Sequence, residues 1–381
     1  MTIDAARGTP PGTVTAPPPP PPSPPPPQEP VRLLTPDGRR VEHPDYDAVF
    51  TAREVRSLYR DLVIVRRLDE EALALARQGE LAVWPSLRGQ EAAQVGSARA
   101  LQPGDMAFPS YREHGVAWCR GVDPVRELGS FRGINHAGWD PREHNLHLPT
   151  IVIGSQVLHA TGYAMGVQRD GAEDAVIAYF GDGATSEGDV NEAFAWAAVQ
   201  NAPIVFFCQN NQWAISEPTE RQSRVPLHRR ADGFGFPGVR VDGNDVLACL
   251  AVTARALDNA RSGQGPTLVE AFTYRMGAHT TTDDPGRYRP RAETEAWLLK
   301  DPVERVRTYL LACGAADEAF LAEVEAEAER IGADLRTRCR ELPDPDLDEL
   351  WDNVYAAEHP LVEDERAAFA AYLASFEDTP R

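Results

Sequence analysis

Two short apolar runs separated by a helical pattern constrain the fold of this chain most strongly. Residues 175–180 (AVIAYF) and 204–208 (IVFFC) are rich in β-branched and aromatic side chains, as is typical of buried strands. Between them, residues 186–189 (SEGD) match a capping box, and apolar residues then recur at helical spacing up to Ala198. A strand, a helix and a strand in this order form a right-handed crossover with parallel strands. The sequence therefore predicts an α/β fold with a mainly parallel sheet.

Polar side chains follow both predicted strands. Asp182 stands between two glycines directly after the first strand, and Asn210 and Asn211 follow the second. Because open α/β sheets bind ligands at the carboxyl ends of their strands, we expect these side chains to share one ligand site. Carboxylate and amide oxygens suit Mg²⁺, which is usually held by one or two protein groups together with phosphates. The predicted metal ligands are Asp182, Asn211 and the backbone carbonyl of Trp213.

The same segment offers a place for an anion. Gly183 lets a bulky anion approach the main chain, and the predicted helix N-terminus near Ser186 has unpaired N–H groups and a positive dipole end. We therefore predict a diphosphate bridged by Mg²⁺. Gly-Asp-Gly alone is also a common turn sequence, and Asn-Asn alone is less specific still. Their combination with the strand, helix and strand pattern favours the ligand site.

At this point the chain resembles a known family. The strings FGDGATSEGD (residues 180–189) and FFCQNNQWAIS (residues 206–216), with 26 residues between Gly-Asp-Gly and Asn-Asn, are similar to the E1 alpha subunits of 2-oxo acid dehydrogenase complexes. The resemblance extends from about Leu33 to Glu358. It implies the thiamine diphosphate-binding fold, a mainly parallel sheet flanked by helices, with thiamine diphosphate and Mg²⁺ as cofactors.

The resemblance implies functions for residues in two loops. Tyr111 and Arg112 lie in a loop similar to the family segment that contacts the diphosphate, and a guanidinium fork suits phosphate oxygens. His279 lies in a loop after a strand-like stretch (residues 267–272) that resembles the family's histidine-containing loop. We predict that His279 is catalytic, because imidazole transfers protons near neutral pH. By residue type alone, the pair also fits a surface salt bridge and the histidine a solvated loop side chain.

The resemblance also suggests that Ser155 and Val157 approach the aminopyrimidine side of the cofactor. Gln209 stands where branched-chain relatives can have arginine, so more of the phosphate charge is expected to fall on Arg112. Glu187 either orients the pocket or begins the helix, where a carboxylate is favoured by the dipole. Thr280 occupies the place that is phosphorylated in eukaryotic branched-chain enzymes, and we interpret it as structural. The predicted cofactor-binding residues are Tyr111, Arg112, Ser155, Val157, Gly183, Ala184, Glu187, Gln209 and His279.

Composition limits the partners and the compartment. The formal charge of −20, from 38 basic and 58 acidic residues, argues against nucleic acid or an anionic membrane as partner. Five scattered cysteines without CxxC spacing indicate neither a disulfide framework nor a zinc site, and suit a reducing cytoplasm. No apolar stretch approaches the roughly 20 residues of a membrane helix, and no apolar signal region is evident. We expect a soluble cytoplasmic protein.

The chain divides into a tail and one domain. Residues 1–30 are predicted to be a disordered Pro-rich tail, either a spacer or a docking segment for SH3-like partners. Residues 31–381 are predicted to form the E1 alpha domain, with a helical region from about residue 300. Periodicity further predicts helices over residues 51–79, 90–101 and 316–342.

The resemblance implies an oxidoreductase that oxidatively decarboxylates a branched-chain 2-oxo acid, such as 3-methyl-2-oxobutanoate, and passes the acyl group to a lipoyl-bearing E2. A separate E1 beta subunit would complete the site in an α₂β₂ heterotetramer. Pyruvate and acetoin enzymes share much of the pattern and remain alternatives. A non-catalytic scaffold is disfavoured, because Asp182, Asn211, Arg112 and His279 are all present. No Walker A or Gly-x-Gly-x-x-Gly sequence indicates another phosphate enzyme.

Overall fold

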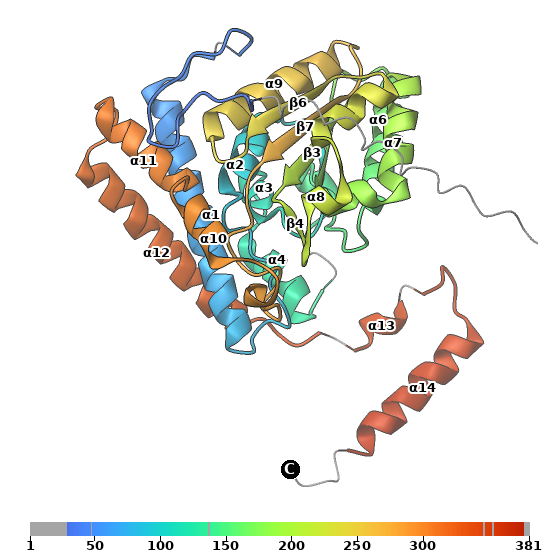
Figure 1. Cartoon of the computed structure of the whole chain (residues 1–381). Helices are drawn as coiled ribbons and strands as arrows, with labels where there is room; N and C mark the ends of the chain where they lie inside the picture. The colour runs from blue at the N-terminus through green and yellow to red at the C-terminus, as the bar shows by residue number, and fades with distance from the viewer. Residues whose placement is uncertain (1–28, 47, 136–137, 346, 353, 377–381) are drawn as a thin grey trace, which may run out of the picture.

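Five parallel strands form the central sheet, in the order β1-β2-β3-β7-β6 (Figure 1). The predicted α/β fold with a mainly parallel sheet is therefore confirmed. The computed structural model describes residues 29–46, 48–135, 138–345, 347–352 and 354–376. The tail predicted for residues 1–30 lies outside this part of the chain except for residues 29 and 30. The strands are β1 (Met106–Phe108), β2 (Val176–Gly181), β3 (Ile204–Asn210), β6 (Gly238–Asp242) and β7 (Thr267–Phe272).

The predicted strand, helix and strand unit is present as β2, α7 (Gly188–Gln200) and β3. The two strands pair in parallel, with Gly181 opposite Gln209. Both strands thus end at the same edge of the sheet. Asp182 follows β2 directly and Asn211 follows β3, so the predicted ligands lie at this edge.

The predicted capping box is wrong. A turn of 3-10 helix, η1 (Asp182–Ser186), comes before α7, and Glu187 is the N-cap of α7 without a side-chain hydrogen bond. The hydroxyl of Thr185 closes the turn by donating to the carbonyl of Asp182 at 2.7 Å. Ser186 instead donates to Oε1 of Gln222 at 3.3 Å. The strand therefore passes into the helix through a tight turn rather than through a capped N-terminus.

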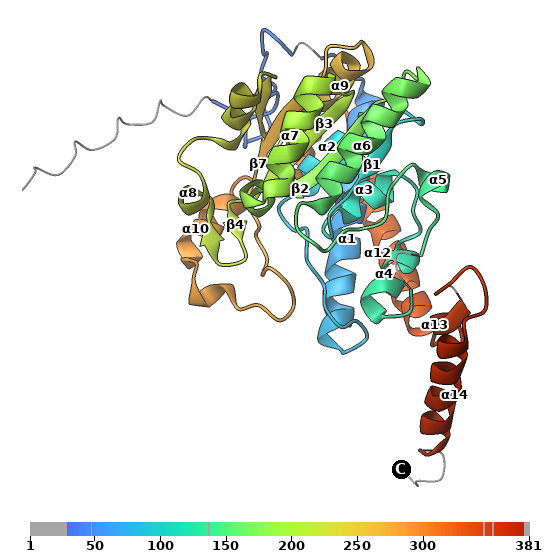
Figure 2. The same ribbon diagram turned by 90° about the vertical axis from the view of Figure 1, so that its right-hand side faces the viewer.

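Helices cover both faces of the sheet. In Figure 2, α6 (Ser155–Asp170) and α7 lie side by side over one face. The other face is covered by α2 (Glu91–Arg99) and α9 (Val246–Arg261). Side chains along β3 alternate between the two layers, since Val205 and Phe207 belong to the α2 and α9 side while Phe206 belongs to the α6 and α7 side. Burial on both faces explains the continuous apolar runs in the sequence.

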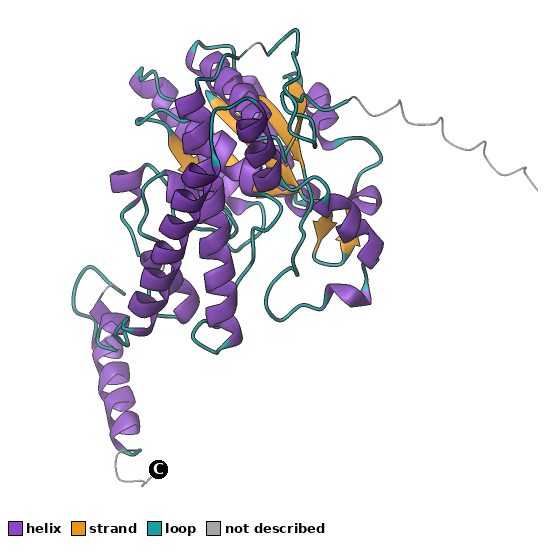
Figure 3. Ribbon diagram, turned by 90° about the vertical axis from the view of Figure 1, so that its left-hand side faces the viewer, coloured by secondary structure: helices purple, strands orange, loops and turns teal. Residues whose placement is uncertain are grey.

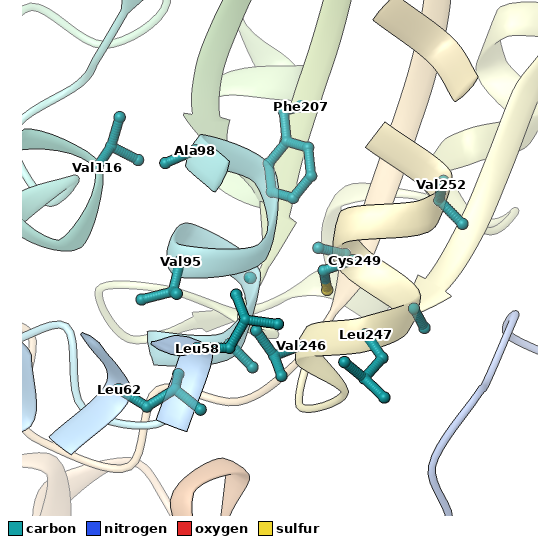
Figure 4. Close-up of a cluster of buried hydrophobic side chains, with 14 of the residues drawn as sticks. Leu58, Leu62, Val95, Ala98, Val116, Phe207, Val246, Leu247, Cys249 and Val252 are labelled. Carbon is teal, nitrogen blue, oxygen red and sulfur yellow. The ribbon is translucent and has the colours of Figure 1, made fainter. Parts of the chain in front are cut away.

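The layer under α2 and α9 forms the larger core. Phe207 lies between Val95 of α2 and Val252 of α9 (Figure 4). The two helices pack closely because Gly96 has no side chain: a Cβ atom there would lie 2.7 Å from Cβ of Cys249. The sheet and its two flanking layers therefore hold the strand ends in fixed positions.

Long helices flank this layered body. α1 (Ala52–Arg77) packs against α11 (Pro302–Ala312) and α12 (Glu318–Arg340), as Figure 3 shows. The helical region predicted beyond residue 300 is confirmed, and its last helix, α14 (Pro360–Ala374), stands away from the body (Figures 1 and 2). The remaining elements are α3 (His114–Cys119), α4 (Pro124–Arg132), α5 (Pro141–His144), β4 (Trp213–Ala214), β5 (Glu217–Pro218), α8 (Thr219–Gln222), η2 (Leu227–Phe234), η3 (Pro285–Arg287), α10 (Arg291–Leu298) and α13 (Glu349–Asp352).

Two composition-based expectations can be compared with the structure. All five cysteines are free, as expected from their spacing. Among the described residues, no helix is long and apolar enough to cross a membrane.

Replacement of Phe207 tests the packing of the larger core. We expect Phe207→Ala to lower the free energy of unfolding by about 3–5 kcal/mol, because the side chain is fully buried and would leave a cavity. The matched control Val199→Ala removes a side chain that is 81% exposed, and should change stability by no more than about 0.5 kcal/mol. Denaturant unfolding of the full chain measures both. Equal effects would contradict the assigned packing.

Candidate active site

A cavity of about 250 Å³ lies at the carboxyl ends of β2 and β3. It is lined by residues from six separate parts of the chain, among them the turn η1, the loop before α3 and the loop after β7. The structure therefore brings together side chains that are far apart in the sequence. The predicted site residues in the lining are Tyr111, Arg112, Asp182, Gly183, Ala184, Glu187, Gln209, Asn211, Trp213 and His279.

Asp182 is a buried carboxylate held by neutral groups. Its Oδ2 atom accepts hydrogen bonds from the hydroxyl of Thr219 at 3.0 Å and from Nε2 of Gln222 at 3.2 Å. No basic side chain in the described part of the chain pairs with it within 4.0 Å. Burial raises the pKa of Asp182 to about 6. A cation at this position would supply the counter-charge that the surrounding protein does not.

The two other predicted metal ligands are held with their oxygens available. Nδ2 of Asn211 donates to Oε1 of Gln90 at 3.1 Å, while its Oδ1 accepts from the Trp213 amide at 3.2 Å. The Trp213 carbonyl accepts from Nη1 of Arg275 at 2.9 Å. A carbonyl oxygen has two lone pairs, so each of these oxygens can also bind a cation. Gln90 and Arg275 line the cavity and were not found from the sequence.

Two arginines place positive charge in the cavity wall. Arg112 is buried and donates to the carbonyls of Ser86 and His279, at 2.6 Å and 3.1 Å. Arg275 is fully buried, and burial followed by the charge of Arg112 lowers the pKa of its guanidinium to about 10. Neither guanidinium forms an ion pair with a carboxylate among the residues that the structure places. Both charges are thus available to a bound anion.

His279 is held between these arginines. Its Nδ1 atom lies 3.2 Å from Nη2 of Arg112 and 3.2 Å from Nη1 of Arg275. Guanidinium nitrogens only donate, so Nδ1 accepts and the proton of the neutral ring is on Nε2. Burial, then Arg112 and Arg275, lower the pKa of His279 to about 3. The ring is therefore neutral near pH 7, whereas the sequence suggested a group that protonates there.

Gln209 is already bonded within the protein. Its Nε2 donates to Oε1 of Glu113 at 2.5 Å, and its Oε1 accepts from Nε2 of Gln94 at 3.0 Å. Glu113 also accepts from the hydroxyl of Ser110 at 2.7 Å, and burial raises the pKa of Glu113. Gln209 thus fixes the loop that contains Arg112. Glu113 is a further buried acid in the cavity wall that sequence reasoning missed.

Ser155 and Val157 are the two predicted residues that the structure does not bring into the lining. Ser155 begins α6 and donates to the carbonyl of Val152 at 3.0 Å, and Val157 is buried in the apolar layer beneath the sheet. The direction of each side chain is set by the first turn of α6. The same stretch lines the cavity with Thr150, Ile153, Gly154 and Gln156 instead.

The glycine of the metal motif has a packing role. A Cβ atom on Gly183 would lie 2.8 Å from Cβ of Ala214, so glycine is required where η1 meets the β4 segment. Close approach of an anion, predicted from the sequence, remains a prediction. Glu187 is exposed at the edge of the cavity, where it precedes α7.

This arrangement is an α/β fold with a charged cavity at the carboxyl ends of its strands. A model of the dehydrogenase E1 component family matches residues 59–345. The chain therefore belongs to the dehydrogenase E1 component family. This result confirms the predicted family, whose members use thiamine diphosphate.

Individual relatives are similar along most of their length. A 3-methyl-2-oxobutanoate dehydrogenase subunit alpha from Mycobacterium tuberculosis is 46% identical over 347 residues, covering 91% of this chain and 95% of the relative. A pyruvate dehydrogenase E1 component subunit alpha from Acholeplasma laidlawii is 37% identical over 330 residues, covering 83% and 92%. Its counterpart from Staphylococcus aureus is 37% identical over 316 residues, covering 82% and 84%. The comparisons support an E1 alpha subunit and favour the branched-chain type.

The neutral protonation state of His279 predicts that the stability of the folded chain depends on pH. Its pKa is about 3 in the folded chain and about 6.5 when unfolded, so the unfolded state binds more protons between these values. Wild-type stability should therefore fall as pH is lowered from 7.5 to 5. His279→Gln removes this contribution. As the pH falls from 7.5 to 5, the unfolding free energy of the variant should therefore decrease less than that of the wild type. Denaturant unfolding at several pH values measures the difference. A difference independent of pH would contradict the neutral, buried ring.

Proposed function

We propose that this cavity binds Mg²⁺ and thiamine diphosphate. The observation that supports it most is that one cavity contains buried, uncompensated charges of both signs. Asp182 is buried without a cationic partner, and Arg112 and Arg275 are buried without an anionic one. A cation bound to a diphosphate meets both. Asp182, Asn211 and the Trp213 carbonyl would hold the metal, and Arg112 the phosphate oxygens.

The donor set suits a hard cation. In the described residues there is no group of three or more histidine, cysteine, aspartate or glutamate side chains that could hold a metal. The proposed site instead combines one carboxylate, one amide oxygen and one backbone carbonyl. Such a set leaves coordination positions for phosphate oxygens and water, which Mg²⁺ prefers to a cage made only of protein.

Thiamine diphosphate, when bound, supplies a carbanion that adds to a 2-oxo acid and takes up the electrons released with CO₂. The chain itself contributes binding and orientation. His279 is proposed as the residue that contacts the reacting groups. Because its Nδ1 accepts from two arginines, it can offer the Nε2 proton as a hydrogen-bond donor to an oxygen in the cavity. The ring of Tyr111 meets that of His279 edge to face, with 6.1 Å between centroids, and limits its movement.

The proposed substrate is a branched-chain 2-oxo acid such as 3-methyl-2-oxobutanoate. The relative with that substrate in its name is 46% identical, against 37% for the relatives named for pyruvate. Phe180, Ile153 and Ile215 add apolar surface to the cavity that suits an alkyl chain. Pyruvate is the second candidate because of the relatives named for it, and acetoin a third.

The site is proposed to be completed by other chains. An E1 beta subunit would supply the carboxylate that activates the aminopyrimidine, in an α₂β₂ assembly, and a lipoyl-bearing E2 would accept the acyl group. The five free cysteines support a reducing compartment such as the cytoplasm. The net charge of −20 disfavours nucleic acid and anionic membranes as partners.

Asp182→Asn tests the metal assignment. We expect the loss of the buried charge to weaken Mg²⁺-dependent cofactor binding by about 3–5 kcal/mol, or more than about 100-fold. Asp189→Asn is the matched control, because Asp189 is exposed in the first turn of α7. Calorimetric titration of thiamine diphosphate with Mg²⁺ into the assembled subunits measures both. Unchanged affinity in Asp182→Asn would refute the assignment.

Reconstitution tests the partner and the substrate together. With an E1 beta subunit present, we expect kcat/KM for 3-methyl-2-oxobutanoate to exceed that for pyruvate by at least about 10–200-fold, the range that a single methylene provides, because the two acids differ by two carbons. The chain alone should show no turnover. Steady-state decarboxylation assays measure these values. A preference for pyruvate would identify the second candidate as correct, and full activity without the beta subunit would refute the shared site.

A further inference from the structure

The one-turn helix α8 lies directly beside the proposed metal ligand. We infer that Thr219 and Gln222 of α8 are positioning residues that present the Asp182 carboxylate to the cation. This inference rests on the proposed function and identifies residues that support the same site. Neither side chain was predicted from the sequence.

Both residues bind the same oxygen of Asp182. They are three positions apart, and residues at this spacing share one face of a helix. The Thr219 hydroxyl lies 3.0 Å and Nε2 of Gln222 lies 3.2 Å from Oδ2. Oδ1 receives neither of these bonds. The two side-chain bonds thus fix the carboxylate through Oδ2, and in the described part of the chain no side chain donates to Oδ1, which can therefore bind a cation.

Gln222 is oriented by its own neighbours. Its Oε1 accepts from the hydroxyl of Ser186 at 3.3 Å, so the amide is turned with Nε2 towards Asp182. Ser186 ends η1, the turn that Asp182 begins. Gln222 therefore connects α8 to both ends of the turn that contains the metal ligand.

Thr219 also lies next to the first asparagine of the pair. Its hydroxyl lies 3.1 Å from Oδ1 of Asn210, and Nδ2 of Asn210 donates to Oε1 of Glu270 at 2.8 Å. Glu270 is itself fixed, since its Oε2 accepts from both the backbone amide and Nδ1 of His228. A hydroxyl has a single hydrogen, and a charged acceptor forms the stronger bond, so this hydrogen goes to Asp182. Oδ1 of Asn210 accepts instead from the backbone amide of Gln212 at 3.1 Å, so its contact with Thr219 is one of packing and not a second donated bond.

The neutral character of these donors matters for the cation. An arginine or lysine in their place would pair with Asp182 and oppose a bound metal by charge repulsion. A hydroxyl and an amide orient the carboxylate and leave its full negative charge to the cation. Groups that orient metal ligands in this way typically contribute 10–100-fold in metal affinity.

The experiment compares Thr219→Val, which keeps the side-chain shape but removes the donor, with Thr219→Ser, which restores the hydroxyl. Gln222→Met removes the second donor, and Glu220→Gln changes an exposed residue of the same helix as the matched control. Each variant is assembled with the beta subunit. Mg²⁺ is titrated by calorimetry at fixed thiamine diphosphate, and turnover is measured at saturating Mg²⁺.

Thr219→Val and Gln222→Met should each weaken the Mg²⁺ affinity by about 10–100-fold, with kcat at saturating Mg²⁺ changed by no more than about twofold. Thr219→Ser and Glu220→Gln should bind Mg²⁺ like the wild type. Wild-type Mg²⁺ affinity in both Thr219→Val and Gln222→Met would overturn the inference, as would a lowered unfolding midpoint without a change in Mg²⁺ affinity. Absence of Mg²⁺-dependent binding in the wild type would instead refute the proposed function on which the inference rests.

Discussion

The parallel pairing of β2 with β3 is the constraint on which the site depends. Gly181 stands opposite Gln209, so Asp182 and Asn211, one and two residues further along their strands, lie at the same edge of the sheet. A slip of one residue in this register would move each side chain of the strand into the opposite layer, where it would not fit the side chains packed around it. The packed core therefore fixes the register of β2 against β3, and this register determines where the proposed ligands lie. The packing of the whole sheet thus fixes the positions of the few oxygen atoms that are proposed to bind the metal.

Burial of charge follows from this placement. The cavity wall contains two acids, Asp182 and Glu113, whose hydrogen bonds come from neutral donors, and two arginines whose hydrogen bonds go to neutral acceptors. Burying an unpaired charge costs several kcal/mol, and the folded chain meets this cost through its core elsewhere. Arg112 and Arg275 also repel each other, and burial together with these two charges keeps His279 neutral. The two charges therefore attract an anion and also contribute to the protonation state of the proposed catalytic residue.

Local pattern was enough to predict the strand, helix and strand unit and, with it, Asp182 and Asn211. It failed at η1, because a capping-box sequence at residues 186–189 cannot show that the Thr185 hydroxyl closes a tighter turn first. Strand β1 has only three residues, and β6 (GVRVD) contains polar residues and a glycine that interrupt any apolar run, so neither was predicted. The resemblance placed Ser155 and Val157 in the site, but the start of α6 decides which side chains of that stretch face the cavity.

The residues missed in the site fall into two kinds. Arg275 follows strand β7 as Asp182 follows β2, so the rule that located Asp182 could have located it. Thr219, Gln222 and Gln90 could not have been found in this way. They bind residues 37, 40 and 121 positions away, and such contacts exist only once the chain has folded. A sequence shows the ligands of a site more readily than the side chains that orient them.

Arg275 also explains how the hairpin after β3 keeps an unfavourable conformation. Ile215 has a φ of 54°, a left-handed conformation that is costly for a β-branched residue, by about 1–3 kcal/mol. Nη2 of Arg275 binds the Ile215 carbonyl at 2.7 Å, while Nη1 binds the Trp213 carbonyl and Nδ1 of His279. One guanidinium therefore holds the strained hairpin, the proposed carbonyl ligand and the proposed catalytic ring in a single arrangement. Because the three are joined through one rigid planar group, movement of the hairpin would displace the metal ligand and His279 together, so both ends of the site form or are lost as one unit.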